Sequence, residues 1–483
     1  MEGICKLLKR SMLLLFAAIV IVSLYMGTRL GGSVFVAFVY GILLCCVCVK
    51  LMPQLVNCLA KVKEWKIFLI LSVLCLMVKF SWIMIFRIEP AMDYATFYGY
   101  AEQLSQNWVA NSRYVALFPH IFGYSSFLSI FIKIFGEGYY LAPILNVVLT
   151  LMSGMILYRI AKILINYQAA IFVYLLWILC PSQTIYNSLV LSEPLYTMLI
   201  LAFILVLAEI NRLNIMTTEL NIWKKLGVGV AAGIILRAIN CCRPIAAIFL
   251  VAIFIWIFVL RIKELREKQF REAWLPFLIS LTFIYVMTGF LWDWYVTMRL
   301  GEEPASVPGY NIMVGFNADS LGTWNQEDSD LLYYYSDQEG STAEWAQQQI
   351  FEDAKKRIFS GEIDFSYLMR EKIKAFLGED DACVSYHSAI LTDVEDLSII
   401  CNSFYYAVLM LGLMGGIMLW KDSRRTVAIL LPLYVIGLTL AQMLVEVAPR
   451  YHYSVLPIVM LLGQYALFHG NKQYKIEKTS DEH

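Results

Sequence analysis

The chain has 483 residues, of which 60% are hydrophobic and only 16% are charged; its mean hydropathy is +0.65 and its formal net charge at pH 7 is zero. A soluble protein needs more charge than this to cover its surface, so the composition excludes a soluble protein and predicts a polytopic membrane protein. No basic block stands outside the short loops, which excludes nucleic acid as a partner.

Apolar segments long enough to cross a bilayer of about 30 Å recur along the chain. They are residues 11–27, 32–50, 66–86, 139–161, 168–187, 190–210, 225–242, 243–261, 273–295, 397–420, 426–446 and 452–469. A further apolar piece at 117–135 either crosses the membrane or lies against it. The first segment has no small-residue cleavage site, so we expect it to remain as a signal anchor. The expected fold is an all-α polytopic membrane protein with about 12–13 transmembrane helices.

Lysine and arginine residues predict the orientation of these helices. If 117–135 does not cross, the basic loops share one side with the N-terminus; they are residues 50–66, 159–167, 211–225, 261–272, 421–425 and the tail. Cytoplasmic loops carry the excess of basic residues, so this side is predicted to be cytoplasmic. The chain has no Asn-x-Ser/Thr glycosylation site, which favours a bacterial plasma membrane as its location.

The predicted segments divide the chain into five parts. They are an N-terminal two-helix membrane hairpin (1–65), a membrane core (66–296) with a first exoplasmic loop at 87–120, an exoplasmic loop domain (297–396), C-terminal membrane helices (397–470) and a cytoplasmic tail (471–483). The loop domain has the composition of a small α/β or mixed fold. Its residues 309–317 predict a short strand or extended piece, and the apolar spacing over 343–359 predicts an amphipathic helix.

Two acidic residues on the predicted exoplasmic side are candidates for chemistry. Asp93 follows a membrane segment, where a carboxylate tuned by burial and neighbours can take a proton from an acceptor hydroxyl. Alternatively, Asp93 only caps the helix that follows it. Glu193 in the Ser-Glu-Pro turn has the same two interpretations, as a helix cap or as a contact to substrate hydroxyls.

Basic and aromatic residues supply candidates for binding a phosphate. The planar guanidinium fork suits phosphate, so Arg450 and Arg243 are candidates, although both could be interfacial anchors whose stems snorkel. Arg237 lies inside a span, where a charge is costly unless it is paired or faces a cavity. Three more candidates are Tyr451, His120 and His452; each histidine is either structural, or steadies the phosphate or orients a hydroxyl. No His/Cys metal-ligand spacing is present, so no cofactor is expected, and a divalent metal stays open but is not indicated.

The order of these motifs resembles the GT-C class of integral-membrane glycosyltransferases, and within it the bacterial relatives of protein O-mannosyltransferases, which are family 39-like. The resemblance covers residues 66–470 and is carried by PAMDYATFY (90–98), FPHIFGY (118–124), CPSQ (180–183), LSEPLY (191–196), Arg243-Pro244 and PRYHY (449–453). The chain departs from the class pattern because two spans, 11–27 and 32–50, precede the helix that should be first.

The resemblance implies a hexosyltransferase of mannosyltransferase type in the cell envelope, which takes a sugar from a polyprenyl-phosphate carrier in the lipid bilayer. The sugar passes, usually with inversion, to an acceptor on the extracytoplasmic face. The acidic residue after the first core helix is the base in that class, which corresponds to Asp93 here. Three alternatives stay open: a glycolipid transporter or flippase, a polysaccharide polymerase or ligase that uses a lipid-linked oligosaccharide, and a structural membrane protein. The absence of an internal repeat and the charges at one surface favour an enzyme over a transporter.

Overall fold

The computed structural model describes residues 2–29, 31–212, 221–262, 264–388, 390–391, 393–421 and 426–469. Within these ranges the chain contains helices and no strand, which confirms the predicted all-α membrane fold. The predicted cytoplasmic tail, residues 471–483, and the basic loop at 422–425 lie outside the described residues.

The first half of the chain forms three long helices, a group of short helices and the membrane core. Their bounds are α1 (Glu2–Arg29), α2 (Gly32–Leu59), α3 (Glu64–Ile85), α4 (Asp93–Gln106), α5 (Arg113–Leu117), α6 (His120–Phe135), α7 (Leu141–Leu164), α8 (Tyr167–Leu179), α9 (Pro181–Ile185), η1 (Tyr186–Ser188), α10 (Glu193–Arg212), α11 (Ile222–Cys242), α12 (Ala246–Phe254), η2 (Ile255–Leu260), η3 (Glu264–Arg266) and α13 (Lys268–Leu300).

The second half contains the long loop and the last membrane helices. Their bounds are α14 (Gly309–Gly315), α15 (Gln326–Ser336), α16 (Ala343–Phe359), α17 (Phe365–Leu377), α18 (Ala382–Ser385), α19 (Val394–Lys421), η4 (Val427–Ile429), α20 (Leu430–Leu444), η5 (Pro449–His452) and α21 (Val455–Phe468). We call residues 297–396, which include α14 to α18, the loop segment.

Nine helices among the described residues are long and apolar enough to cross a membrane, namely α1, α2, α3, α7, α10, α11, α13, α19 and η4 with α20. A tenth span is formed if α8 and α9–η1, bent by 60° at Pro181, count as one. The bend follows from proline, which lacks a backbone N–H and disfavours helical backbone in the residue before it. The predicted spans 243–261 and 452–469 fall among the shorter apolar helices, as does the ambiguous piece 117–135, which forms α6.

Glycines let the membrane helices approach closely. A Cβ added at Gly415 of α19 would lie 1.9 Å from the backbone oxygen of Leu462 on α21, and one at Gly233 of α11 would lie 2.7 Å from the oxygen of Leu281 on α13. Helix packing inside a membrane has little hydrophobic driving force and relies on such close contact between small residues. These two seams join α19 to α21 and α11 to α13.

The loop segment differs from the sequence prediction at one element. The sequence predicts a short strand or extended piece at residues 309–317, but their first seven residues form the helix α14 (Gly309–Gly315), which docks on α16. Gln347 of α16 accepts a hydrogen bond from the Tyr310 N–H at 2.8 Å, and a Cβ at Gly309 would lie 2.0 Å from the Gln347 backbone oxygen. The predicted amphipathic helix over 343–359 is confirmed as α16, which Thr342 caps by accepting the Trp345 N–H. The described part of the loop segment is therefore helical and not α/β.

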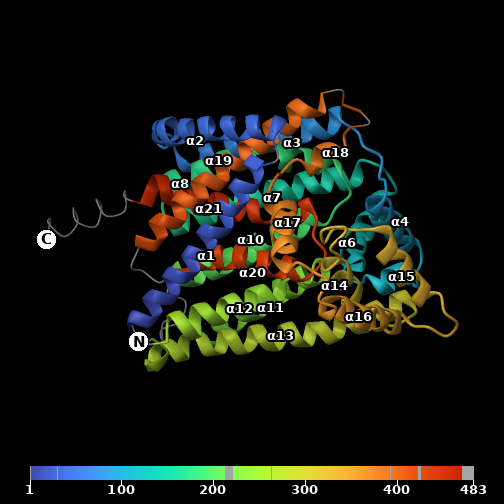
Figure 1. Cartoon of the computed structure of the whole chain (residues 1–483). Helices are drawn as coiled ribbons and strands as arrows, with labels where there is room; N and C mark the ends of the chain where they lie inside the picture. The colour runs from blue at the N-terminus through green and yellow to red at the C-terminus, as the bar shows by residue number, and fades with distance from the viewer. Residues whose placement is uncertain are drawn as a thin grey trace.

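The polar connections gather at one end of the bundle. Figure 1 shows α4 of the first loop and the apolar helix α6 beside α14, α15 and α16 of the loop segment at the right, whereas the N-terminus lies at the opposite end. Backbone hydrogen bonds tie the two groups, since the Ala305 N–H donates to the Ala116 oxygen at 2.8 Å. The end that collects these loops is where the candidate residues lie.

Candidate active site

Asp93 is the first residue of α4 and its side chain is paired with an arginine. Its Oδ2 accepts a hydrogen bond from Arg450 Nη2 at 2.6 Å. The cap position of α4 belongs to Met92, whose φ of 51° turns the chain sharply and whose side chain makes no cap bond. The Asp93 side chain is 48% exposed and that of Arg450 only 15%, so the carboxylate faces water and the guanidinium lies behind it.

Arg450 lies in η5, which Pro449 begins after the end of α20. Its Nη1 donates to the Tyr94 hydroxyl at 3.4 Å, and its guanidinium carbon lies 5.6 Å from the centre of the Tyr94 ring. Its Nε is buried and has no hydrogen-bond partner. A buried N–H without an acceptor is costly, so this donor can still bind an anion in the site.

Arg243 and Arg450 both contact one aromatic ring. Arg243 ends α11 in extended backbone because the next residue is Pro244, which disfavours helical backbone before it. Its guanidinium carbon lies 4.0 Å from the centre of the Tyr451 ring, and that of Arg450 lies 5.8 Å from the same centre. Tyr451 thus brings two cations together from segments more than 200 residues apart in the sequence. Such a pair of guanidinium groups can bind a phosphate by charge-assisted hydrogen bonds.

His120 and Glu193 border this cluster. Burial, with the charges of Arg243 and Arg450, lowers the pKa of His120 to about 3, so its imidazole is neutral at physiological pH. Glu193 begins α10 with a buried side chain, accepts a hydrogen bond from Ser192 Oγ at 3.4 Å and interacts electrostatically with both arginines. The structure therefore brings together six of the predicted candidates: Asp93, His120, Glu193, Arg243, Arg450 and Tyr451.

The structure places the other two candidates elsewhere. Arg237 donates from Nε and Nη2 to the Tyr285 backbone oxygen at 3.2 and 2.8 Å, so its contacts lie on α13. His452 faces Phe376 and Asp380, with its Nδ1 2.6 Å from the Phe376 oxygen and its Nε2 3.0 Å from Asp380 Oδ1. Arg237 thus uses its N–H donors between α11 and α13, and His452 holds α17 to η5.

Sequence reasoning missed Glu446, a further carboxylate beside the arginines. Glu446 lies between α20 and η5, and burial raises its pKa although Arg450 and Arg243 oppose the shift. It precedes Arg450 by four residues, and this Glu-x-x-x-Arg spacing just before the last span was the available signal. Tyr114 of α5 was also missed; burial and the charge of Asp93 raise the pKa of its hydroxyl. Among the described residues, no group of three or more His, Cys, Asp or Glu is arranged to hold a metal ion.

Comparison with known proteins gives a match in structure but not in sequence. No family model matches the chain, and no curated protein matches it. The archaeal oligosaccharyltransferase AglB from Archaeoglobus fulgidus, solved with an inhibitory peptide and a dolichol-phosphate, aligns with a TM-score of 0.50 over 87% of this chain at 10% identity. The two proteins share a fold. This chain spans about half of the oligosaccharyltransferase, since the alignment covers 52% of that protein.

Two further structures align less well. They are those of ArnT from Cupriavidus metallidurans, bound to undecaprenyl phosphate and in the apo state. The first aligns over 84% of this chain and 79% of ArnT, with a TM-score of 0.38 and 12% identity. The second aligns over 83% and 77%, with a TM-score of 0.37 and 14% identity.

Proposed function

We propose that this chain is a membrane glycosyltransferase that moves a sugar from a polyprenyl-phosphate-linked donor to an acceptor hydroxyl on the extracytoplasmic face of a bacterial plasma membrane. The observation that carries the proposal is the 2.6 Å pair between Asp93 and Arg450, with Arg243 against the same Tyr451 ring as Arg450. The pair puts a candidate base beside the cations that a leaving phosphate needs.

The proposed reaction is a single displacement. Asp93 takes the proton of the acceptor hydroxyl as its oxygen attacks the anomeric carbon of the sugar. The bond between that carbon and the carrier phosphate breaks, and the electron pair leaves with the phosphate oxygen. Arg450 and Arg243 then stabilise the phosphate charge with their N–H donors. The greater exposure of Asp93 supports entry of the acceptor from water, with the phosphate bound deeper.

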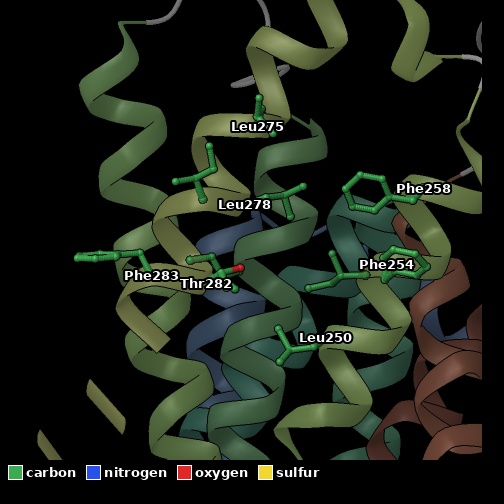
Figure 2. Close-up of a pocket in the computed structure, with 10 residues that line it drawn as sticks. Leu250, Phe254, Phe258, Leu275, Leu278, Thr282 and Phe283 are labelled. Atoms are coloured by element: carbon green, nitrogen blue, oxygen red, sulfur yellow. The ribbon is translucent and has the colours of Figure 1, made fainter. Parts of the chain in front are cut away.

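An apolar groove between membrane helices suits the lipid part of such a donor. The groove has a volume of about 550 Å³ and lies between α12–η2 and α13; Figure 2 shows Leu250, Phe254 and Phe258 on one wall and Leu275, Leu278 and Phe283 on the other. Its first residue, Leu250, follows Arg243 by seven positions and lies in α12, which begins at Ala246 after the extended backbone of Arg243. A polyprenyl tail could therefore run along this groove while its phosphate stays at Arg243.

The type of sugar follows only from the resemblance to relatives of the protein O-mannosyltransferases. A hexose on a polyprenyl phosphate, such as mannose, is the first donor to test. A polymerase or ligase that uses lipid-linked oligosaccharides would need the same base and phosphate site, and separate assays with mono- and oligosaccharide carriers distinguish the two. A glycolipid flippase would move the intact carrier and leave the sugar bond unbroken.

The proposal is tested by sugar transfer from a labelled polyprenyl-phosphate-sugar in purified membranes. Asp93→Asn keeps the size of the side chain and removes its basicity, so we expect transfer to fall by about 100-fold or more, as for loss of a general base. Binding of the donor should be retained. Equal transfer by the variant and the native chain would remove Asp93 from the chemistry and make Glu193 or Glu446 the next base to test.

We also propose that the reaction needs no divalent metal. Arg243 and Arg450 supply the positive charge at the phosphate that a metal ion supplies in other transferases. Transfer measured after treatment with a chelator is therefore expected to equal transfer without it. A loss that added Mg²⁺ or Mn²⁺ restores would contradict this prediction.

A further inference from the structure

Lys372 of α17 is a buried lysine outside the cluster described above. Its side chain is fully buried, and its Nζ donates to the backbone oxygens of Gly315 at 2.7 Å, Met443 at 3.0 Å and Val445 at 2.7 Å. An ammonium group has three N–H donors, one for each of these carbonyls, whereas a neutral amine would leave one carbonyl without a donor. The arrangement suits the charged form of Lys372.

The three carbonyls belong to two distant parts of the chain. Gly315 ends α14 in the loop segment, whereas Met443 and Val445 lie at the end of α20. A Cβ at Gly315 would lie 2.5 Å from the carbonyl carbon of Val445, so the absence of a side chain permits this approach. Lys372 therefore joins the loop segment to a membrane helix at its end.

Backbone hydrogen bonds extend this junction. The N–H of Glu446 donates to the Asn311 oxygen at 2.7 Å, and the N–H of Val447 donates to the Gly322 oxygen at 2.9 Å. We call residues 443–447 the clasped segment, because their hydrogen bonds with Lys372, Asn311 and Gly322 all connect them to the loop segment. It leads within three residues to Arg450, and Pro449 restricts the backbone between them.

We propose that Lys372 is a positioning residue for the phosphate-binding arginine: by holding the clasped segment against the loop segment, it fixes Arg450 and Glu446 opposite Asp93. The inference rests on the proposed function, because it assigns Lys372 a part in donor binding. Lys372 does not touch the cluster residues through its Nζ contacts, so it acts through the backbone.

The protonation of Lys372 gives this role a pH signature. Burial lowers the pKa of Lys372 to about 7, and the charge of Glu446 opposes the shift. In the described part of the chain, the groups that face Nζ are the Glu446 carboxyl, the three carbonyls and the Phe316 ring, whose centre is 5.5 Å away. As pH rises through about 7, one carbonyl loses its donor and the clasped segment loosens. Transfer should fall over that range, and Lys372→Arg, which stays charged, should move the fall to higher pH.

The test compares the native chain with Lys372→Met, Lys372→Arg and the matched control Lys225→Met in lipid nanodiscs. Lys225 is also buried and donates to a backbone oxygen, that of Glu272, but it lies at the opposite end of α11 from Arg243. Two quantities are measured: amide hydrogen exchange of peptides that cover residues 443–450, and kinetics of sugar transfer from a labelled polyprenyl-phosphate-sugar on both sides of pH 7.

Lys372→Met is expected to speed exchange at Glu446 and Val447 and to lower kcat/KM about tenfold or more, mainly through a higher KM for the donor. Lys372→Arg should restore part of the slow exchange and part of kcat/KM. Lys225→Met should change neither the exchange in residues 443–450 nor the transfer kinetics. If Lys372→Met does not fold, Gly315→Ala, which pushes on Val445, is expected to speed the same exchange.

Unchanged amide exchange in the Lys372 and Gly315 variants would show that Lys372 does not hold the clasped segment. Faster exchange with unchanged transfer kinetics and an unshifted pH profile would overturn the positioning role. If the native chain transfers no sugar, the proposed function fails instead, and the exchange measurement still decides whether Lys372 holds the clasped segment.

Discussion

At the scale of single residues, the proposed reaction would place two anions, the Asp93 carboxylate and the donor phosphate, in competition for the guanidinium of Arg450. In the structure its Nη2 is held by Asp93 at 2.6 Å, and its buried Nε has no partner. A donor phosphate that binds this fork would draw Nη2 away and leave the Asp93 carboxylate free to accept a proton. Binding of the donor and activation of the base would then be coupled through one side chain.

This coupling depends on the planar shape of the arginine side chain as well as its charge. A lysine side chain would keep the charge but lose the fork, so for Arg450→Lys we expect kcat/KM for transfer to fall by about 10- to 100-fold, which corresponds to about 1.5–3 kcal/mol for a charged hydrogen bond. Steady-state transfer kinetics measure this. Arg159→Lys is the matched control, because Arg159 pairs with Glu209 at 2.6 Å outside the cluster. Equal losses in the two variants would contradict the prediction.

Glu379, in the turn between α17 and α18, gives a prediction about stability. Burial, with the charge of Asp381, raises the pKa of Glu379 from 4.5 to about 7. Between these values the folded chain keeps a proton that the unfolded chain has lost, so this carboxyl makes stability fall as pH rises from about 4.5 to about 7. Glu379→Gln should remove that part of the fall, which thermal unfolding in detergent at several pH values measures. If Glu379→Gln shows the same pH dependence of stability as the native chain, Glu379 does not cause this fall.

At the scale of elements, the helices are held together by contacts between small residues and, at the break between α8 and α9, by the side chain of Lys79. Pro181 follows the end of α8 and cannot donate to the Trp177 carbonyl, which instead accepts from the buried Nζ of Lys79 at 3.3 Å. The same Nζ donates to the Cys180 oxygen at 3.2 Å, which also accepts from the Thr184 hydroxyl at 2.9 Å. A buried carbonyl without a donor would be costly in a membrane, so the break in α8 and the lysine on α3 require each other.

The close contact between α19 and α21 at Gly415 gives a prediction about stability. In Gly415→Ala the new methyl group would meet the Leu462 oxygen, so the helices must separate, and we expect a loss of about 1–3 kcal/mol. Gly227→Ala on α11 is the matched control: no atom lies within 4 Å of its added Cβ, and it should stabilise the helix by about 0.5–1 kcal/mol. Thermal or denaturant unfolding of the two variants should therefore shift in opposite directions. If both variants shift the unfolding transition in the same direction, the close contact at Gly415 does not limit the packing of α19 on α21.

At the scale of the whole molecule, the proposed chemistry requires the loop segment and the N-terminus to lie on opposite sides of the membrane. Phe359 is 84% exposed on the loop segment, and Trp65 is 62% exposed at the start of α3, in the predicted cytoplasmic loop. In a cysteine-free background, Phe359→Cys should react with a membrane-impermeant thiol reagent in intact cells. Trp65→Cys should react only after lysis. The reverse pattern would invert the orientation and place Asp93 in the cytoplasm.

The sequence by itself determined the class of fold and most helix positions, because apolar length is a local property of the chain. Side-chain chemistry and motifs near helix ends and prolines gave eight candidate residues, of which the structure leaves Arg237 and His452 outside the cluster. The sequence left the role of Asp93 open between cap and base, since both uses need a carboxylate at the start of a helix.

Only the tertiary structure decided which of these residues meet. The Tyr451 ring brings Arg243 and Arg450 together, and nothing local to either arginine encodes that contact. The helix α14, in a segment predicted as extended, and the hydrogen bonds of Lys372 likewise depend on partners more than 30 residues away. Long-range contacts of this kind come from packing, which hydropathy and spacing along the chain do not specify.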